Sequence, residues 1–274
     1  MPSGRLTRHS TPSGPRWAFE DRYLPAGVNL SLLLALTAER MRAILRDLMG
    51  EEEARDPLLA PVDPMHEVWA GGVTYVRSRE ARKTESKSAD IYERVYDAAR
   101  PELFLKSIGW RVIGPGANVR IRADSRWNVP EPEIVLVVNA FGEIVGFTAG
   151  NDMSSRDIEG ENPLYLPQAK IYDGSCALGP GILLADYDEL VDVTIGLRVR
   201  RDDRDVFVGT VSTAAMKRRF DELVLALHAE YAIPAGILLL TGTGIVPPDD
   251  FTLAIGDEIL VSVGPLSLQN TVAG

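Results

Sequence analysis

The chain of 274 residues is 45% hydrophobic, enough to bury one large core or a small domain beside a larger one. Its 29 basic and 39 acidic residues give a net charge of −10, which argues against nucleic acid and anionic membranes as partners and leaves small molecules. A single cysteine, Cys176, excludes an internal disulfide framework, three dispersed histidines argue against a zinc site, and both features fit a reducing cytoplasm.

The N-terminal segment gives no sign of export. Residues 1–17 are polar, contain three prolines and lack the apolar core of a signal peptide. No run in the chain approaches the roughly 18 apolar residues of a membrane span. Residues 1–20 are therefore interpreted as a tail, or as a tail with one edge strand, of a protein without membrane insertion.

A helix is expected next. Leucine, methionine and isoleucine recur near helical spacing over residues 29–50, with Asn29 or Ser31 as the cap and Gly50 as the stop. The stretch 51–64 mixes an acidic run with three prolines, which disfavours both a helix interior and a central strand. We therefore predict a boundary near residue 60, with a small N-terminal domain over 1–60 and a larger domain over 61–274.

The larger domain has the pattern of a strand-rich fold. Apolar residues alternate with period two over 191–199 and again over 257–263. Two helices are predicted between strands, over 89–100 and 212–231. Because strands and helices do not alternate as βαβ units, the sequence predicts an α+β protein with an antiparallel or mixed β-sandwich or roll.

An acidic pair precedes the most apolar run of the chain. In the segment "VPEPEIVLVVN", residues 129–139, Glu131 and Glu133 are two apart and project to the same face of an extended strand, with Pro132 keeping the approach extended. The pattern alone is weak, since Glu-x-Glu also occurs at 51–53 and 159–161. The buried strand that follows strengthens it, because unpaired like charges entering an interior cost several kcal/mol.

A third carboxylate is predicted to join the pair. The apolar run, a turn at 139–142 and the segment 143–150 read as a hairpin that returns Asp152 to the end where Glu131 and Glu133 lie. Three carboxylates without thiolate or imidazole suit Mg²⁺ or Mn²⁺ with open coordination positions, which suggests catalysis. The alternative for Asp152 is an ordinary turn residue after Asn151.

Longer segments resemble a known family. The string over 150–182, with "PEPE" at 130–133 and "LLTGTGIV" at 239–246, is similar to the fumarylacetoacetate hydrolase superfamily. The resemblance runs from about Trp69 to about Val263, and within the superfamily it is greatest to 2-keto-3-deoxy sugar-acid dehydratases of the 2-dehydro-3-deoxy-D-arabinonate type. It implies the mixed β-sandwich or roll, a homodimer or homotetramer, and a metal-dependent catalytic domain over 61–274.

The resemblance also implies the roles of particular residues. Glu131, Glu133 and Asp152 match the Mg²⁺ ligands of the family. Lys170 and Glu102 match acid/base candidates, although a lysine is commonly solvated and a glutamate after Pro101 also suits the first turn of a helix.

Substrate contacts are implied in two places. The loop 241–244, with Thr243, corresponds to the segment that faces the substrate carboxylate in the family. Ser78 and Arg79 lie in the charged segment 77–90, which corresponds to a lid, although a plain solvated loop explains the same composition.

The function implied is the Mg²⁺-dependent dehydration of a 2-keto-3-deoxy pentonate to a dioxo acid, with proton removal at C3 and loss of the C4 hydroxyl. A C–C bond hydrolase of acylpyruvates and an oxaloacetate-type decarboxylase would use the same site. The hydrolase relatives carry a histidine on the lid, and no histidine occurs between His66 and His228. A catalytically silent binding protein is the remaining alternative.

Overall fold

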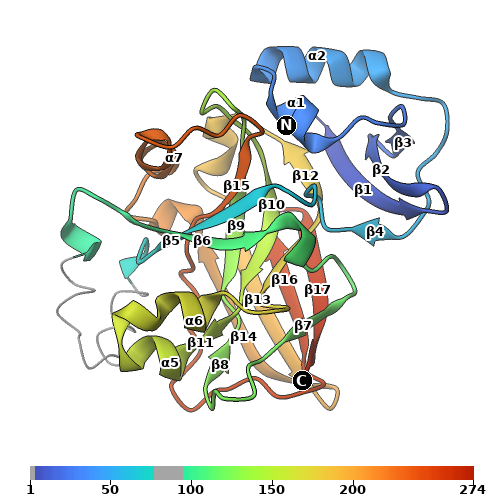
Figure 1. Ribbon diagram of the computed structural model, residues 1–274. Helices are drawn as coiled ribbons and strands as arrows, with labels where there is room; N and C mark the ends of the chain where they lie inside the picture. The colour runs from blue at the N-terminus through green and yellow to red at the C-terminus, as the bar shows by residue number, and fades with distance from the viewer. Residues whose placement is uncertain (1–3, 77–94) are drawn as a thin grey trace.

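The computed structural model describes residues 4–76 and 95–274. Within these residues the chain is strand-rich, with helices confined to short segments (Figure 1). The strands form two larger sheets and one short pair. The predicted class, a strand-rich α+β fold with a mixed β-sandwich, is confirmed.

The larger sheet contains antiparallel neighbours and one parallel pair, β15 with β5. Its order is β3 (Arg22–Tyr23), β2 (Gly14–Phe19), β1 (Arg5–Thr11), β12 (Cys176–Leu184), β10 (Ile144–Asp152), β9 (Pro132–Val138), β15 (Ile237–Leu240), β5 (Glu67–Gly72) and β6 (Glu102–Ile108), with β4 (Leu58–Leu59) on β1. The second sheet has the order β14 (Arg204–Ser212), β13 (Thr194–Arg201), β16 (Glu258–Val263), β17 (Leu266–Ala273) and β7 (Asn118–Arg120). The short pair is β8 (Asn128–Val129) with β11 (Ser154–Ser155).

The helices that lie wholly within the described residues are α1 (Leu30–Leu34), α2 (Ala38–Leu48), α5 (Arg156–Glu161), α6 (Leu166–Lys170) and α7 (Phe220–His228). Single 3₁₀ turns occur at Gly109–Arg111, Pro163–Tyr165, Tyr187–Leu190 and Thr213–Ala215. In Figure 1, α5 and α6 lie next to each other, on the side of the molecule away from α1 and α2.

Strand β9 is buried on both faces, which explains its unbroken apolar run. Ile134 and Leu136 pack between the two sheets, against side chains of β13, β16 and β17. Val135 and Val137 point the other way and pack with side chains of α1 and α2. The hairpin predicted from residues 134–150 is present as β9 and β10, with antiparallel pairing.

The predicted helix over 29–50 is two helices. Asn29 caps α1 by accepting from the N–H of Leu32 at 2.9 Å, as expected. The prediction of one continuous helix is wrong because Thr37 is extended, with φ −64° and ψ 156°, and begins a second helix as its N-cap.

The predicted helix over 212–231 is also shorter, since α7 covers only Phe220–His228. The N–H of Lys217 donates to the carbonyl of Thr74 at 2.9 Å, so it is not available for a helical bond, and Arg219 is extended. The predicted helix over 89–100 lies partly outside the described residues.

The N-terminal elements lie on one side of the molecule and continue the larger sheet (Figure 1). Strand β1 pairs antiparallel with β12, at Arg5 with Leu183 and at Leu6 with Ile182. The division into domains over 1–60 and 61–274 stays a prediction.

Candidate active site

The β9–β10 hairpin brings together the three carboxylates that the sequence predicted to converge. Pro132 begins β9, so Glu131 and Glu133 lie on either side of the first strand residue and face the same way. Gly150 pairs with Glu133, and the N–H of Asp152 donates to the carbonyl of Glu131 at 2.9 Å. One oxygen from each of the three carboxylates lies within 4.8 Å of the other two.

The carboxylate cluster is shielded from water. The exposed fractions are 4% for Glu131, 1% for Glu133 and 2% for Asp152. Burial raises the pKa of Glu133 well above its usual value, and the charges of Asp152 and Glu131 raise it further. Lys170 and the N–H of Gly242, which donates to Glu133 Oε2 at 2.6 Å, act in the opposite direction. A cation between the carboxylates would relieve this repulsion.

Two cationic side chains reach the cluster from the segment that follows β10. The ammonium of Lys170, at the end of α6, lies 2.7 Å from Glu131 Oε2 and 3.3 Å from Asp152 Oδ2. Arg156, at the start of α5, donates from Nη2 to Glu131 Oε1 at 2.9 Å. Lys170 is 1% exposed, so the alternative of a solvated lysine is wrong.

The donor set fits a hard divalent cation. Each carboxylate has about four lone-pair positions, so an oxygen that accepts from Lys170 or Arg156 can still coordinate a metal. All three candidate ligands, Glu131, Glu133 and Asp152, offer oxygen, the donor that Mg²⁺ prefers.

Glu102 forms part of the opposite wall. It is the first residue of β6 and not a first-turn helix residue, so the helix-dipole alternative is wrong. A Cβ on Gly72 would lie 2.1 Å from Glu102 Oε2, which means that the carboxylate rests directly against the backbone of the paired strand β5. Glycine at position 72 leaves room for the Glu102 carboxyl group in this position.

The loop 241–244 follows β15 and turns into the same pocket. Gly242 has φ +90°, and a Cβ there would lie 2.2 Å from Thr74 Oγ1, so this turn requires glycine. Thr243 is buried and lines the pocket, and its hydroxyl exchanges hydrogen bonds with the backbone of Ile245 at 3.1 and 3.3 Å.

The pocket thus collects most of the predicted site residues from five separate segments. It is lined by Gly71, Gly72, Val73, Glu102, Phe104, Glu131, Asp152, Glu159, Leu166, Lys170, Gly242 and Thr243. Glu133 is not part of this lining, although an oxygen of its carboxylate lies within 4.8 Å of those of Glu131 and Asp152. Ser78 and Arg79 lie outside the described residues, so their predicted contacts stay predictions.

Three buried charged residues of this site, Lys106, Arg156 and Glu159, were not predicted from the sequence. Lys106 lies in the same strand as Glu102, but at a register shift in the pairing of β6 with β5, so simple alternation does not predict where its side chain points. Arg156 lies four residues after Asp152, but no local pattern shows that its side chain turns inward. Glu159 lines the pocket and accepts from Ser154 Oγ at 2.9 Å.

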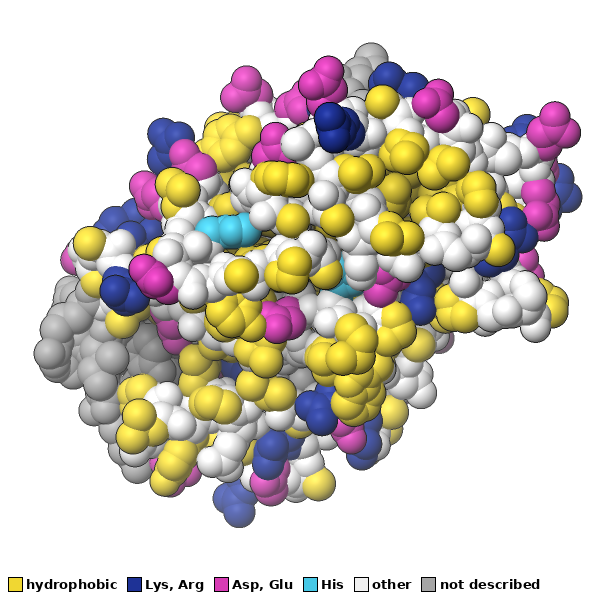
Figure 2. All heavy atoms as spheres, turned by 45° about the horizontal axis from the view of Figure 1, so that its top comes forward, with side chains coloured by type: hydrophobic (Ala, Val, Ile, Leu, Met, Phe, Trp, Pro, Cys, Tyr) yellow, Lys and Arg dark blue, Asp and Glu magenta, His cyan; other side chains and the backbone are white. Residues whose placement is uncertain are grey.

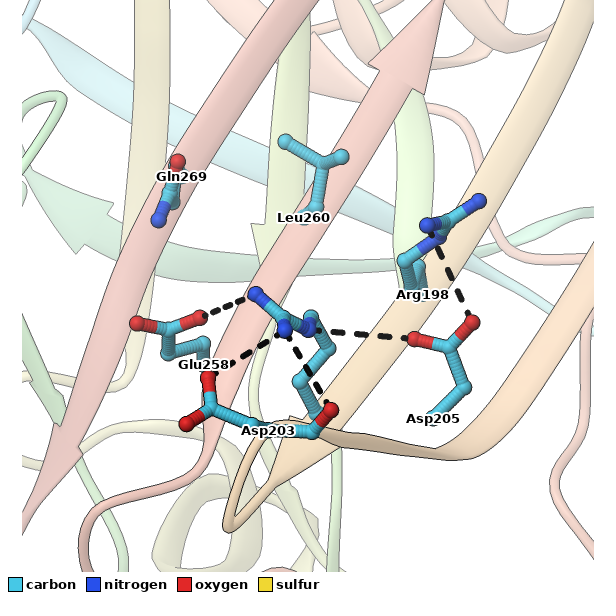
Figure 3. Close-up of a pocket in the computed structure, with 7 residues that line it drawn as sticks. Arg198, Asp203, Asp205, Glu258, Leu260 and Gln269 are labelled. Atoms are coloured by element: carbon cyan, nitrogen blue, oxygen red, sulfur yellow. Dashed lines mark hydrogen bonds and ion pairs between the residues drawn. The ribbon is translucent and has the colours of Figure 1, made fainter.

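A second hollow lies on the outer face of the smaller sheet (Figure 3). Arg200 lies there among Asp203, Asp205 and Glu258, and each of these acids is within 3.9 Å of its guanidinium. The lining consists mainly of exposed charges that pair with one another, and we assign no function to this hollow.

The chain belongs to a known enzyme family. The profile of the fumarylacetoacetate (FAA) hydrolase C-terminal family matches residues 68–273, which confirms the superfamily that the sequence predicted. Solved structures with the name 2-keto-3-deoxy-D-arabinonate dehydratase share the fold. The apo form has a TM-score of 0.84, with 32% identity over 98% of this chain and 98% of the other. A form complexed with magnesium and 2,5-dioxopentanoate has a TM-score of 0.82, with the same identity and coverage.

Two curated relatives are dehydratases of the same kind. A probable 2-keto-3-deoxyxylonate dehydratase of Haloferax volcanii is 44% identical over 214 residues, which are 77% of this chain and 73% of the relative. The 2-dehydro-3-deoxy-D-arabinonate dehydratase of Saccharolobus solfataricus is 42% identical over 208 residues, which are 74% and 70% of the two chains. These relatives bear out the predicted resemblance to sugar-acid dehydratases.

The distribution of surface charge and the character of the helices bear on possible partners. In the view of Figure 2, lysine and arginine side chains are dispersed among aspartates and glutamates and do not gather in one stripe. Within residues 4–76 and 95–274, no helix has both the length and the apolar character that a membrane crossing needs.

Proposed function

We propose that this chain is a Mg²⁺-dependent dehydratase that converts a 2-keto-3-deoxy pentonate into a 2,5-dioxo acid. The observation that carries the proposal is the convergence of Glu131, Glu133 and Asp152 with the ammonium of Lys170 in one buried pocket. The dehydratase relatives, and the similar structure that holds magnesium and 2,5-dioxopentanoate, support the same reaction.

The three carboxylates would hold the divalent cation. When bound, the cation would draw electron density from the α-oxo acid end of the substrate and make the C3 proton more acidic. Glu131 and Asp152 line the pocket, so a cation held by them would be within reach of a substrate in it.

Lys170 is the proposed base at C3. Its Nζ lies against Glu131 and Asp152 and therefore next to the end of the substrate that the cation holds. In the neutral form the amine takes one proton from C3, a step for which a positioned base contributes about 10²–10⁴-fold in rate.

Glu102 is the proposed acid at C4. It projects from β6 into the pocket that Lys170 also lines, with Gly72 leaving room for its carboxyl group. It gives a proton to the C4 hydroxyl as the C4–O bond breaks, so that one C3 proton and one hydroxyl leave as water. Tautomerisation of the unsaturated product then yields the aldehyde at C5.

The substrate carboxylate would lie against the loop 241–244. Thr243 lines the pocket from this loop and is the proposed contact. Ser78 and Arg79 complete the proposed substrate contacts.

Further parts of the proposal concern the metal and the assembly. Mg²⁺ is the first choice because a similar structure contains it, and Mn²⁺ suits the same oxygen donors. We also infer a homodimer or homotetramer and a location in the cytoplasm, in keeping with one buried free cysteine.

The test is to incubate the purified protein with Mg²⁺ and a panel of 2-keto-3-deoxy pentonates and hexonates, with acylpyruvates and oxaloacetate alongside, and to identify the products by mass spectrometry. A dioxo acid 18 Da lighter than a deoxy sugar acid is expected, from the loss of one water. Pyruvate released only from acylpyruvates, carbon dioxide only from oxaloacetate, or binding of 2-keto acids without turnover would overturn the proposal.

A further inference from the structure

A lysine that was not among the predicted site residues lies next to the carboxylates of the active site. Lys106 is on β6, at the point where the pairing of β6 with β5 shifts register, and Glu102 and Phe104 of the same strand line the pocket. Its exposed fraction is 0%. Because a buried ammonium is costly unless its donors are satisfied, the position of Lys106 requires specific acceptors.

The acceptors come from two different elements. Lys106 Nζ donates to the carbonyl of Met153 at 2.9 Å and to the carbonyl of Lys170 at 2.5 Å, and it lies 2.5 Å from Asp152 Oδ1. Two of these contacts are hydrogen bonds to backbone carbonyls, and the third, to Asp152 Oδ1, is an ion pair.

The arrangement fixes Asp152 from both sides. Lys106 lies at Oδ1, while the ammonium of Lys170 lies 3.3 Å from Oδ2. Lys106 also donates a hydrogen bond to the carbonyl of Lys170. This carbonyl is at the C-terminal end of α6, where backbone carbonyls have no partner inside the helix. One side chain thus connects the carboxylate of Asp152 to the backbone that carries Lys170.

We propose that Lys106 is a positioning residue of the reaction, which sets the distance between the metal-binding carboxylate of Asp152 and the base Lys170. The inference rests on the proposed function, since it assumes that Asp152 binds the cation and that Lys170 takes the C3 proton. Outer-shell partners of this kind change metal affinity or activity by about 10- to 100-fold when they are removed. A misplacement of about 1 Å in a reacting group costs about 10²-fold in rate.

The test uses Lys106→Met, which keeps the length of the side chain and removes the charge and the donors. We expect Mg²⁺ to bind about 10- to 100-fold more weakly in isothermal titration calorimetry. At saturating Mg²⁺, kcat should fall about 10²-fold while KM for the substrate changes less than about threefold. A residue that only stabilises the fold would lower the melting temperature and leave the Kd for Mg²⁺ and kcat unchanged, and that result would overturn the inference.

The matched control is Ser107→Ala, at the next position of β6. Ser107 is buried and its hydroxyl donates to the carbonyl of Ile108 at 3.3 Å, so this change perturbs the same strand at the neighbouring position and leaves the contacts of Lys106 in place. Its Kd for Mg²⁺ and its kcat should equal those of the unchanged protein. A loss equal to that of Lys106→Met would mean that any disturbance of β6 has the effect, and the inference would fail.

A second variant covers the case in which Lys106→Met does not fold. Lys106→Arg keeps the charge, but a planar guanidinium cannot direct donors to three oxygens that surround one point. It should fold with weaker Mg²⁺ binding and a lower kcat, and unchanged values would refute a positioning role. Failure of the unchanged protein to bind Mg²⁺ would instead refute the proposed function.

Discussion

Two clusters of charged residues in this protein contain similar groups and differ in their contact with water. In the hollow of Figure 3, the side chains around Arg200 are 43% exposed for Asp205, 45% for Glu258 and 97% for Asp203. In the active site, Glu133 is 1% exposed and Lys106 is fully buried. Water screens the exposed pairs, so each contributes little, whereas every buried charge needs a defined partner.

The difference in burial determines which of the two clusters can bind a metal cation and take part in a reaction. The exposed acids Asp203, Asp205 and Glu258 pair with two arginines, Arg198 and Arg200, and all of these charges remain in contact with water. Burial, and after it the charges of Asp152 and Glu131, raise the pKa of Glu133 even with Lys170 present. Three carboxylate oxygens that converge within 4.8 Å in a dry pocket suit a metal cation, whereas the exposed acids are solvated and paired with arginines.

The largest effect is expected for Glu133→Gln. It removes one ligand charge, and we expect kcat to fall by more than about 10³-fold, since a catalytic metal supplies several kcal/mol. Without metal the variant should melt no lower than the unchanged protein, because the repulsion among the buried carboxylates is relieved. Thermal melting with and without Mg²⁺ checks this, and Mg²⁺ should stabilise only the unchanged protein.

The control for that change is Glu258→Gln, which makes the same substitution in the exposed cluster. Its activity and its response to Mg²⁺ should be unaffected. Retention of activity by Glu133→Gln would remove the metal assignment.

Lys170→Met should have the next largest effect, a loss of about 10²–10⁴-fold in kcat. The amine is the proposed base, so the variant should also fail to exchange the C3 protons of the substrate with solvent deuterium. Proton NMR in D₂O measures this exchange. Normal C3 exchange in a variant that cannot dehydrate would move the base to another residue.

Glu102→Gln is expected to slow dehydration by about 10²-fold and to preserve C3 exchange. The reason is that Glu102 acts on the C4 hydroxyl, after the proton has left C3. The same NMR experiment separates the two steps. If both exchange and dehydration vanish together, Glu102 is the base and the two roles are reversed.

The smallest effect is expected for a substitution in the exposed cluster. Arg200→Ala removes pairs with three acids, and the free energy of unfolding should change by no more than about 1 kcal/mol because these pairs are solvated. Urea denaturation measures the change. A loss of several kcal/mol would contradict the distinction between the two clusters.

The sequence predicted those parts of the site that follow from local geometry. Glu131 and Glu133 face one way because strand residues alternate, and the hairpin returns Asp152 to them. These relations depend on residues close together in the chain.

The parts that the sequence did not predict depend on distant contacts. Lys106 reaches the cluster only because β6 pairs with β5, which pairs with β15 beside β9. The N-terminal end of the predicted helix over 212–231 is lost to a hydrogen bond between Lys217 and Thr74. No pattern within either segment predicts these distant contacts. The catalytic roles of Lys170 and Glu102 came from the family resemblance, because the residue patterns alone also allowed a solvated lysine and a first-turn helix glutamate.

The central claim, that three buried carboxylates hold one hard cation, is tested most directly by crystals soaked in Mn²⁺, with anomalous diffraction to locate the ion. The account predicts one strong peak within about 2.0–2.6 Å of oxygens from Glu131, Glu133 and Asp152. A peak elsewhere, or no peak between these carboxylates at millimolar Mn²⁺, would contradict it.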